Sequence, residues 1–424
     1  MMIKEHRSWY GTILLIGFLV LLVSSGVRAF PSTLVLPWQQ DFGWSRGGIS
    51  AVIATGTLLF GLIGPFSAAF LQRYGARRVG SAALLILALV TFALPFMKTI
   101  WQAEILVGLI SGTMTGAVAD VYGIYIANNW FMKNRGFVLG IFTASSSVGQ
   151  LIVLPILAGM IDTQGWRQTA LAVAAFIVVV LFMIFWLMRD YPYQVGLSPF
   201  GSRVQVAPVY PKISVQAVLL QPLQALHNAA KSKVFWLLAI PFFVCGASTS
   251  GLIGVHFIAA GHDYGMSEVN VANIMALMGI FDIIGSLTAG LLTEKFDSRY
   301  ILMTMYGLRG LDLFLLPIAF TQGGTLLIAY AILFGFSWNA TVSPTIKLIA
   351  DNFGIKESGM LFGWVFVLHQ IGGALMAYTS GAMHDMAHTY VMAFGMAGII
   401  CLVAAMMVFI VPKPVKRFSS FSTR

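Results

Sequence analysis

The chain has 424 residues, of which 58% are hydrophobic and only 9% are charged, and its formal net charge is +10. A soluble domain usually carries about 25% charged residues, so this composition excludes a protein with a fully water-exposed surface and indicates that lipid is its solvent. The two cysteines, Cys245 and Cys401, both lie in apolar runs, so we expect neither a disulfide framework nor a cysteine metal site.

Apolar runs long enough to cross a bilayer follow one another along the whole chain. A spanning helix needs about 20 mostly apolar residues, and the sequence offers twelve candidates. They are residues 10–37, 48–71, 79–98, 101–128, 136–160, 167–188, 233–260, 267–293, 300–320, 323–349, 357–380 and 389–412. The first run is too long for a signal peptide and lacks a small-residue cleavage site, so we expect it to stay in the protein.

A polar stretch with several prolines separates the sixth run from the seventh. We therefore predict an N-terminal six-helix bundle at 1–188, a cytoplasmic linker at 189–232 and a C-terminal six-helix bundle at 233–424. Within the linker, Ser214–Ala230 is expected to form a short surface helix.

Basic residues predict how the chain lies in the membrane. With a cytoplasmic N-terminus, all but five of the 25 lysines and arginines fall on the cytoplasmic side, as the positive-inside rule requires. The exceptions are Arg46, Lys98 and Arg167 outside, and Arg28 and Arg309 within spans. We predict a multi-pass inner-membrane protein with both termini in the cytoplasm. Because the basic residues are scattered over short loops, no nucleic-acid partner is expected.

The sequence contains an internal duplication. The turn Asp41–Ser50 (DFGWSRGGIS) returns as Asp263–Ala272 (DYGMSEVNVA), with aspartate, glycine and serine in the same register. Two parallel halves of this kind predict a binding site at their interface, near the middle of the bilayer. Further pairs in nearly the same register are Gln72 with Glu294, Arg73 with Lys295, Arg77 with Arg299, Gly136 with Gly359, Gly140 with Gly363 and Gly149 with Gly372.

The segment from Gly64-Pro65 to Gln72-Arg73-Tyr74-Gly75-Ala76-Arg77-Arg78 resembles the cytoplasmic signature of the major facilitator superfamily. The resemblance covers essentially the whole chain. It implies an all-α membrane protein with twelve helices in two pseudo-symmetric six-helix bundles, which transports a solute by alternating access.

In that family the signature loop locks one conformation through charge contacts. The resemblance therefore implies a cytoplasmic gate made of Arg73, Arg77, Arg78, Glu294 and Arg299. The acid that usually begins the loop core is Gln72 here, while the repeat keeps Glu294. The alternative is that the arginines are only anchors at the membrane surface.

Ala29-Phe30-Pro31, followed by Asp41-Phe42-Gly43-Trp44-Ser45-Arg46, resembles the monocarboxylate porter and oxalate–formate antiporter branch. This resemblance implies a small organic anion as substrate, a carboxylate, carried with protons. Two positions depart from the branch. Ser32 stands where animal members have a lysine, and Ser286 stands where an arginine would follow the aspartate matched by Asp282.

Arg28 lies near the middle of the first span, where a charge costs roughly 3 kcal/mol on insertion scales. In the resembled fold the first, fourth, seventh and tenth helices line the cavity, and Arg28 is one turn from Ser32. We predict that its planar guanidinium binds a carboxylate. The alternative is a structural ion pair between Arg28 and a residue of the fourth or fifth helix. Asp120, in the fourth helix, is either that partner or a proton carrier.

Asp282 has no basic residue one turn away, which suits a proton-coupled cycle. The alternative is a neutral, hydrogen-bonded acid. In the eleventh span, His369 with Gln370 is a candidate titratable anion contact, or else a packing histidine. Further candidates for the cavity lining are Ser32, Tyr122, Tyr125, Trp338, Asn339, Ser248-Thr249-Ser250 and His256.

Arg309 and Asp312 lie three residues apart in the ninth span, a spacing that predicts a mutual structural pair on one helix face. The chain shows no catalytic constellation and no nucleotide-binding loop, so we expect neither an enzyme nor a cofactor. The resulting hypothesis is a monomeric, proton-coupled transporter of organic anions. Its alternatives are an exporter of amphipathic compounds, an anion exchanger and a membrane receptor that transports nothing.

Overall fold

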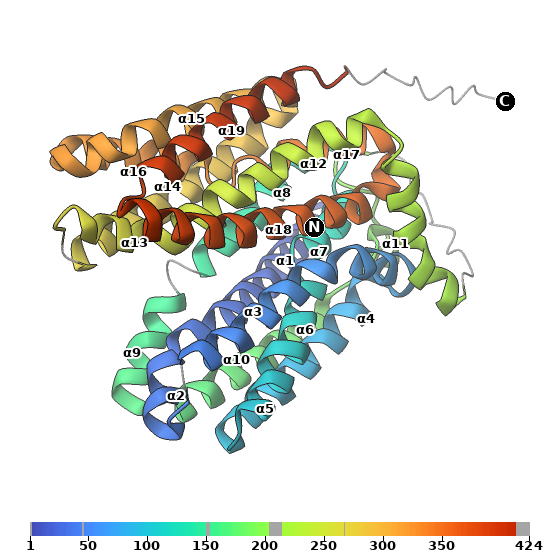
Figure 1. Cartoon of the computed structure of the whole chain (residues 1–424). Helices are drawn as coiled ribbons and strands as arrows, with labels where there is room; N and C mark the ends of the chain where they lie inside the picture. The colour runs from blue at the N-terminus through green and yellow to red at the C-terminus, as the bar shows by residue number, and fades with distance from the viewer. Residues whose placement is uncertain (1, 45, 150–152, 203–213, 267, 413–424) are drawn as a thin grey trace.

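The computed structural model of the chain describes residues 2–44, 46–149, 153–202, 214–266 and 268–412 (Figure 1). These residues are almost wholly helical, and Phe131 and Phe200 form an isolated parallel bridge. The two serines of the duplicated turn, Ser45 and Ser267, lie outside the described residues, as do residues 203–213 of the predicted linker.

The first half of the chain forms helices α1 to α10. Their bounds are α1 (Met2–Thr33), α2 (Val35–Phe42), α3 (Arg46–Leu62), α4 (Gly64–Ala93), α5 (Ile100–Ala103), α6 (Gly112–Ala117), α7 (Asp120–Trp130), α8 (Arg135–Val148), α9 (Leu154–Gln164) and α10 (Trp166–Leu187). A π-helical segment, Glu104–Ser111, joins α5 to α6.

The second half forms helices α12 to α19, after a linker helix α11 (Val215–Ala229) that confirms the expected surface helix to within one residue at each end. Their bounds are α12 (Lys233–Gly246), α13 (Gly254–Asp263), α14 (Glu268–Lys295), α15 (Ser298–Gln322), α16 (Gly324–Ser337), α17 (Val342–Phe353), α18 (Ile355–Ala387) and α19 (Val391–Phe409). The limits proposed for the two bundles and the linker stay predictions.

Ten of the twelve expected spans are long and apolar enough to cross a membrane as described. The other two, the second and the fifth, are each divided. The second breaks between α3 and α4, where Pro65 starts the new helix, and only Ala51–Leu62 counts as an apolar segment. The fifth consists of α8 and α9, and residues 150–152 between them are not described.

Four further expected spans contain a break or an irregular turn. The first expected span changes direction at Leu34 and the fourth at Val118–Ala119, while the tenth is interrupted at residues 338–341 and the seventh contains the π-helical turn Ala247–Ile253. Irregular backbone at membrane depth is tolerated only inside protein or beside a water-filled cavity. These four spans are the ones that the family resemblance implies to line the cavity.

The two ends of the molecule differ in how closely the halves approach. We call the end with Gln72, Asn128, Glu294 and Lys356 the linker end, and the end with Asp41 and Asp263 the turn end. In Figure 1, helices α2 and α9 of the first half lie away from α13 and α16 of the second at the turn end. Helices α7, α11 and α17 gather at the linker end.

Duplicated glycines form two seams between the halves. A Cβ added at Gly140 of α8 would lie 2.7 Å from the Ser286 carbonyl oxygen of α14, and one at Gly363 of α18 would lie 2.6 Å from the Pro65 nitrogen of α4. Both distances are far inside van der Waals contact, so only glycine lets these backbones approach so closely. The duplication therefore gives each half one glycine-faced helix that packs on the other half.

The duplicated aspartates fasten the turn end within each half. Asp41 accepts hydrogen bonds from the Trp166 indole nitrogen at 2.7 Å and from Arg167 at 2.5 Å, and Asp263 lies 2.9 Å from His384. The Trp166 hydrogen bond and the nearby Arg167 charge lower the pKa of Asp41 below its usual value. The aspartate of the duplicated turn therefore has a structural role in each half, because it holds the turn to a neighbouring helix.

Candidate functional site

A cavity of about 400 Å³ lies between the halves, on the turn-end side of Asp282. Its walls come from α8 and α9 of the first half and from α13, α14 and the α16–α17 break of the second. Asp282 and Ser147 provide its polar side chains, while Trp338, Met275, Met278 and several alanines make most of the remaining wall. The cavity is large enough for a small organic molecule.

Asp282 is 4% exposed and is surrounded by hydrogen-bond partners from both halves. Its carboxylate accepts bonds from the Asn339 backbone nitrogen at 2.8 Å, from Asn339 Nδ2 at 2.7 Å, from Ser286 Oγ at 3.4 Å and from Ser147 Oγ. Among the described residues no basic side chain pairs with Asp282, as its surroundings in the sequence led us to expect, and these bonds fit the alternative of a hydrogen-bonded acid. The Asn339 donors suit a carboxylate, and both serine hydroxyls can accept if the acid carries a proton.

Arg28 lies at the inner face of the first half. Its guanidinium sits 4.8 Å from the centre of the Phe60 ring, and its buried Nε has no hydrogen-bond partner in the part of the chain that the structure describes. With Ile53, Gly56 and Thr115 it lines a space of about 20 Å³, which holds roughly one water molecule. The cation is therefore only partly compensated in this conformation.

The Asp120 carboxylate lies within electrostatic range of two side chains, the Arg28 guanidinium and the His369 imidazole. Asp120 occupies the first turn of α7, where the helix dipole favours a negative charge. Within the described part of the chain, no ion pair of 4 Å or less joins Arg28 to Asp120. The predicted partnership is therefore a longer-range attraction in this conformation.

An aromatic bridge connects this cluster across the two halves, and the sequence analysis missed it. The Phe60 ring lies 5.8 Å from Phe366 of α18, and Phe366 stacks on His369 at 5.3 Å. Together with the cation–π contact to Arg28, the bridge runs from the first half to the second. Aromatic residues occur in every span here, so the sequence alone offers no means of choosing these two.

The remaining predicted cavity residues are divided. Trp338 and Asn339 lie at the cavity with Asp282, and His369 hydrogen-bonds the neighbouring Gln370 at 3.1 Å.

Two tyrosines lie elsewhere: Tyr122 is fully buried and donates to the Ala76 carbonyl, and Tyr125 bonds Tyr191 near the linker end. Ser32 is exposed and its hydroxyl bonds Ala29 in its own helix. His256 bonds Tyr390 and the Ala377 carbonyl, and Ser248 and Thr249 bond backbone carbonyls of their own helix.

The expected pair of Arg309 with Asp312 was wrong. Arg309 is fully buried and donates to the Trp338 carbonyl at 2.9 Å and to the Ser337 carbonyl. Asp312 Oδ2 is buried, and no described residue forms a hydrogen bond with it. A spacing of three residues places both side chains on one face, but the carbonyls at the end of α16 hold the guanidinium.

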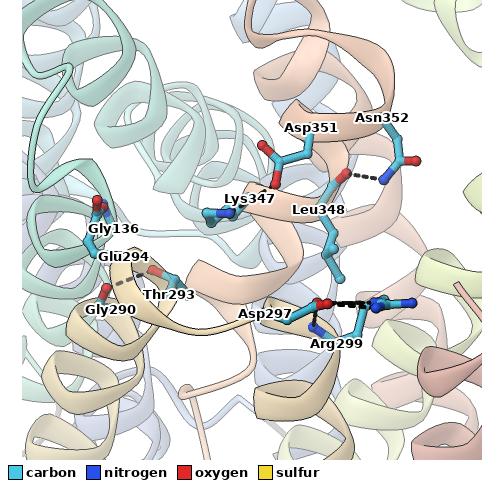
Figure 2. A network of polar contacts seen from close by, with 10 residues as sticks. All are labelled: Gly136, Gly290, Thr293, Glu294, Asp297, Arg299, Lys347, Leu348, Asp351 and Asn352. Carbon is cyan, nitrogen blue, oxygen red and sulfur yellow. Dashed lines mark hydrogen bonds and ion pairs between the residues drawn. The ribbon is translucent and has the colours of Figure 1, made fainter. Parts of the chain in front are cut away.

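At the linker end, hydrogen bonds to backbone atoms hold the halves together. Gln72 Nε2 donates to the Lys356 carbonyl at 2.7 Å, and Asn128 Nδ2 donates to the Ile355 carbonyl and to Ser358 Oγ. Figure 2 shows Glu294 beside Gly136, whose backbone nitrogen donates to its carboxylate. Gln72 thus crosses between the halves although it lacks the family's negative charge.

The predicted gate residues other than Glu294 contact their own half. The Arg77 backbone nitrogen bonds Asp190 at 2.8 Å and its guanidinium bonds the Phe185 carbonyl, while Arg299 pairs with Asp297 at 2.6 Å (Figure 2). Arg73 lies over the Tyr74 ring and Arg78 is exposed. Asp190, which the sequence analysis did not name, is the acid of this loop, and burial raises its pKa above the usual value.

Comparison with known proteins matches this arrangement. A model of the Major Facilitator Superfamily matches residues 14–259 and 242–424. Among curated relatives, the MFS-type transporter YcxA of Bacillus subtilis is 25% identical over 92% of this chain and 91% of its own length. The fujikurins efflux protein of Gibberella fujikuroi is 28% identical over 82% of this chain and 70% of its own length. Monocarboxylate transporter 12 of Xenopus laevis is 25% identical over 68% of this chain and 64% of its own length.

Among solved structures, the proton:xylose symporter XylE aligns with a TM-score of 0.68 at 16% identity, covering 96% of this chain and 97% of XylE. That similarity concerns the fold. The family model matches two segments that together cover both halves of the chain. The structure likewise has two halves, each with a glycine-faced helix packed on the other half. The chain is therefore a member of the Major Facilitator Superfamily.

Proposed function

We propose that this protein is a secondary active transporter that carries a small organic anion, a carboxylate, together with protons across the inner membrane. The observation that carries the proposal is Arg28, a partly buried guanidinium in a membrane span whose buried Nε has no hydrogen-bond partner among the described residues. A cation in this position gains most from a bound anion, because a planar guanidinium can hold a carboxylate by two parallel hydrogen bonds.

The conformation fits one state of an alternating-access cycle. If the basic loops are cytoplasmic, the linker end faces the cytoplasm and its hydrogen bonds close that side. The cavity beside Asp282 extends between α9 and α13 toward the turn end. This state is outward-facing, and transport requires the two halves to rock until the linker end opens.

Proton coupling is assigned to Asp282. The carboxyl lies at the cavity, and its serine partners can reverse their donor and acceptor roles when a proton binds. Ser147 belongs to the other half, so the charge of Asp282 affects a contact that must change during rocking. Asp120 is a second acid in range of Arg28 and modulates the affinity of the cation for an anion.

The monocarboxylate transporters among the relatives support an anionic substrate, whereas Ser32 and Ser286 replace two cations of that branch. Export of amphipathic compounds is a second candidate function. The methionine-rich and alanine-rich wall of the 400 Å³ cavity favours it, and one relative is described as an efflux protein.

A ligand screen followed by a flux measurement tests the proposal. The purified protein is melted in the presence of a panel of organic acids, with amphipathic amines and neutral compounds as comparison, because a ligand of the folded state raises the melting temperature. Hits are then measured as uptake into proteoliposomes with and without a pH gradient. Stabilisation by acids and gradient-driven uptake are expected. Stabilisation by amphipathic compounds alone favours the exporter.

A further inference from the structure

A second buried polar cluster lies inside the second half, away from the cation site at Arg28. At its centre is Arg309 of α15, which is fully buried although it lies in a membrane span. Its guanidinium donates to the Ser337 and Trp338 carbonyls, to Cys245 Sγ at 3.1 Å and to Ser248 Oγ at 3.4 Å. No carboxylate in the described residues lies within 4 Å of it.

Arg309 holds the break in the tenth expected span. Ser337 ends α16, and carbonyls at a helix end lack partners within the helix and carry the negative end of its dipole. A buried guanidinium supplies hydrogen bonds to these carbonyls and a positive charge beside the negative end of the dipole. The residue after Trp338 is Asn339, which donates two hydrogen bonds to Asp282. Arg309 therefore fixes the short segment that presents Trp338 and Asn339 to the cavity.

Asp312 lies one helical turn beyond Arg309 and is 3% exposed. Among the described residues, neither its Oδ2 nor the buried hydroxyl of Tyr330 on α16 has a hydrogen-bond partner. Tyr330 lies in electrostatic range of both Arg309 and Asp312. An ionised carboxylate buried in this way would be uncompensated. A protonated, neutral Asp312 would avoid this cost.

The same spacing makes a second arrangement available. Residues three apart on a helix can touch, and a charge-assisted bond between a guanidinium and a carboxylate is stronger than bonds to neutral carbonyls. Loss of the Asp312 proton to water would thus attract the guanidinium away from the Ser337 and Trp338 carbonyls.

We propose that Asp312 is a proton-binding site outside the transport cavity, and that its ionisation moves Arg309 from the end of α16 to Asp312. The move frees the α16–α17 break and with it the Asn339 clamp on Asp282. The titratable groups around the pair are Tyr306 on α15, Tyr330 on α16, Cys245 on α12 and Cys401 on α19. Proton binding at Asp312 does not depend on which solute is transported, so this proposal stands apart from the proposed function.

Infrared spectroscopy tests the proton directly. The carbonyl stretching band of protonated carboxyls is followed in the purified wild type, in Asp312→Asn and, as a matched control, in Asp282→Asn while the pH is raised. We expect a band that disappears on alkalinisation, is missing in Asp312→Asn and persists in Asp282→Asn. A band pattern unchanged by Asp312→Asn overturns the proposal. If Asp312→Asn does not fold, Asp312→Ser replaces it, and failure of both neutral variants also counts against a protonated Asp312.

Cys245 reports the movement of Arg309. In a Cys401→Ser background, alkylation of Cys245 by a small membrane-permeant maleimide is timed with aspartate or asparagine at position 312. The two rates should agree at low pH. Above the pH at which Asp312 ionises, the aspartate protein should react about fivefold more slowly or more, the lower end of typical coupling energies, because the departed Arg309 no longer favours the reactive thiolate. Equal rates at every pH show that Arg309 does not move.

Discussion

Ser147 of α8 hydrogen-bonds Asp282 of α14 at the point where contact between the two halves gives way to the cavity. On one side of this bond the helices pack through Gly140 and Ser286. On the other side, Pro155 and Met275 face the 400 Å³ space. The proposed proton carrier is thus also part of the contact that has to change during transport.

Asp282→Asn should abolish accumulation driven by a pH gradient while exchange of solute survives. Asparagine has the shape of the acid and no titratable proton, so it separates coupling from movement. The measurement compares net uptake under a pH gradient with equilibrium exchange in the same proteoliposomes. Ser147→Ala is the matched control, because it removes the contact but keeps the acid. Uphill uptake by Asp282→Asn at the wild-type level would assign coupling to another group.

Arg28 variants should bind an identified anionic substrate in the order wild type, Arg28→Lys, Arg28→Gln, from tightest to weakest. Lysine keeps the charge but loses the two-pronged geometry. Loss of a charge-assisted contact costs about 1.5–3 kcal/mol, or roughly ten- to a hundredfold in affinity. Calorimetric titration gives the constants. Equal affinities in all three proteins would make Arg28 structural, and failure of both variants to fold would favour the partnership with Asp120.

Gly140→Ala should shift the protein toward a state that is open at the linker end. The added methyl group meets the Ser286 carbonyl, and overpacking of this kind costs about 1–3 kcal/mol. That energy changes the ratio of states by roughly fivefold to over a hundredfold. Pulsed electron paramagnetic resonance between spin labels at the exposed Lys133 and Glu357 measures the opening.

The matched control for this substitution is Gly159→Ala in α9, the other part of the same expected span. Nothing lies within 4 Å of a Cβ added there, so the label distances should stay those of the wild type. Equal distance distributions in Gly140→Ala and the wild type would show that the seam tolerates a side chain.

Asp41→Asn should flatten the acid limb of the stability profile. The Trp166 hydrogen bond and Arg167 lower the folded-state pKa of Asp41. The stabilisation is therefore fully present above the unfolded pKa and is lost as the pH falls through the folded value. Melting temperatures from pH about 7 to about 3 should fall less in the variant than in the wild type. Asp162→Asn, an exposed acid near the same end, is the control, and parallel profiles for Asp41→Asn and the wild type would contradict the fastening role.

A cysteine at Ser202 should resist an impermeant thiol reagent added to intact spheroplasts. The expectation follows from the basic-loop orientation, which places the segment after α10 in the cytoplasm. The native Cys245 and Cys401 are both buried, so background labelling is low, and lysed spheroplasts provide the positive control. Ready labelling of intact cells would reverse the orientation and make the observed state inward-facing.

Composition and duplication were sufficient to predict the all-helical fold and its two similar halves, because scarce charge and long apolar runs leave few alternatives. The duplication also aligned Gly140 with Gly363, and the structure places both in seams between the halves, a role that the sequence analysis did not predict. The sequence did not show which helix face each residue occupies. Tyr122 and Tyr125 were predicted at the cavity from their closeness to Asp120, yet they point to other parts of their own half.

Competition between partners was the other obstacle. The spacing of Arg309 and Asp312 permits an ion pair, but the break after Ser337 supplies carbonyls that no sequence pattern announces. Similarly, Asp282 was judged by the absence of a basic neighbour, while its partners Asn339 and Ser147 come from distant segments. Where several partners are possible, tertiary geometry decides among them.

The amide side chains of Gln72 and Asn128 close the linker end by donating to main-chain carbonyls. Neither bond joins two full charges, so dissolved ions have little to screen there. Raising the ionic strength would therefore leave these two contacts nearly intact, whereas an acid-based lock at Gln72 would weaken. We therefore expect that a change from dilute to concentrated salt does not open the linker end through the loss of these two contacts.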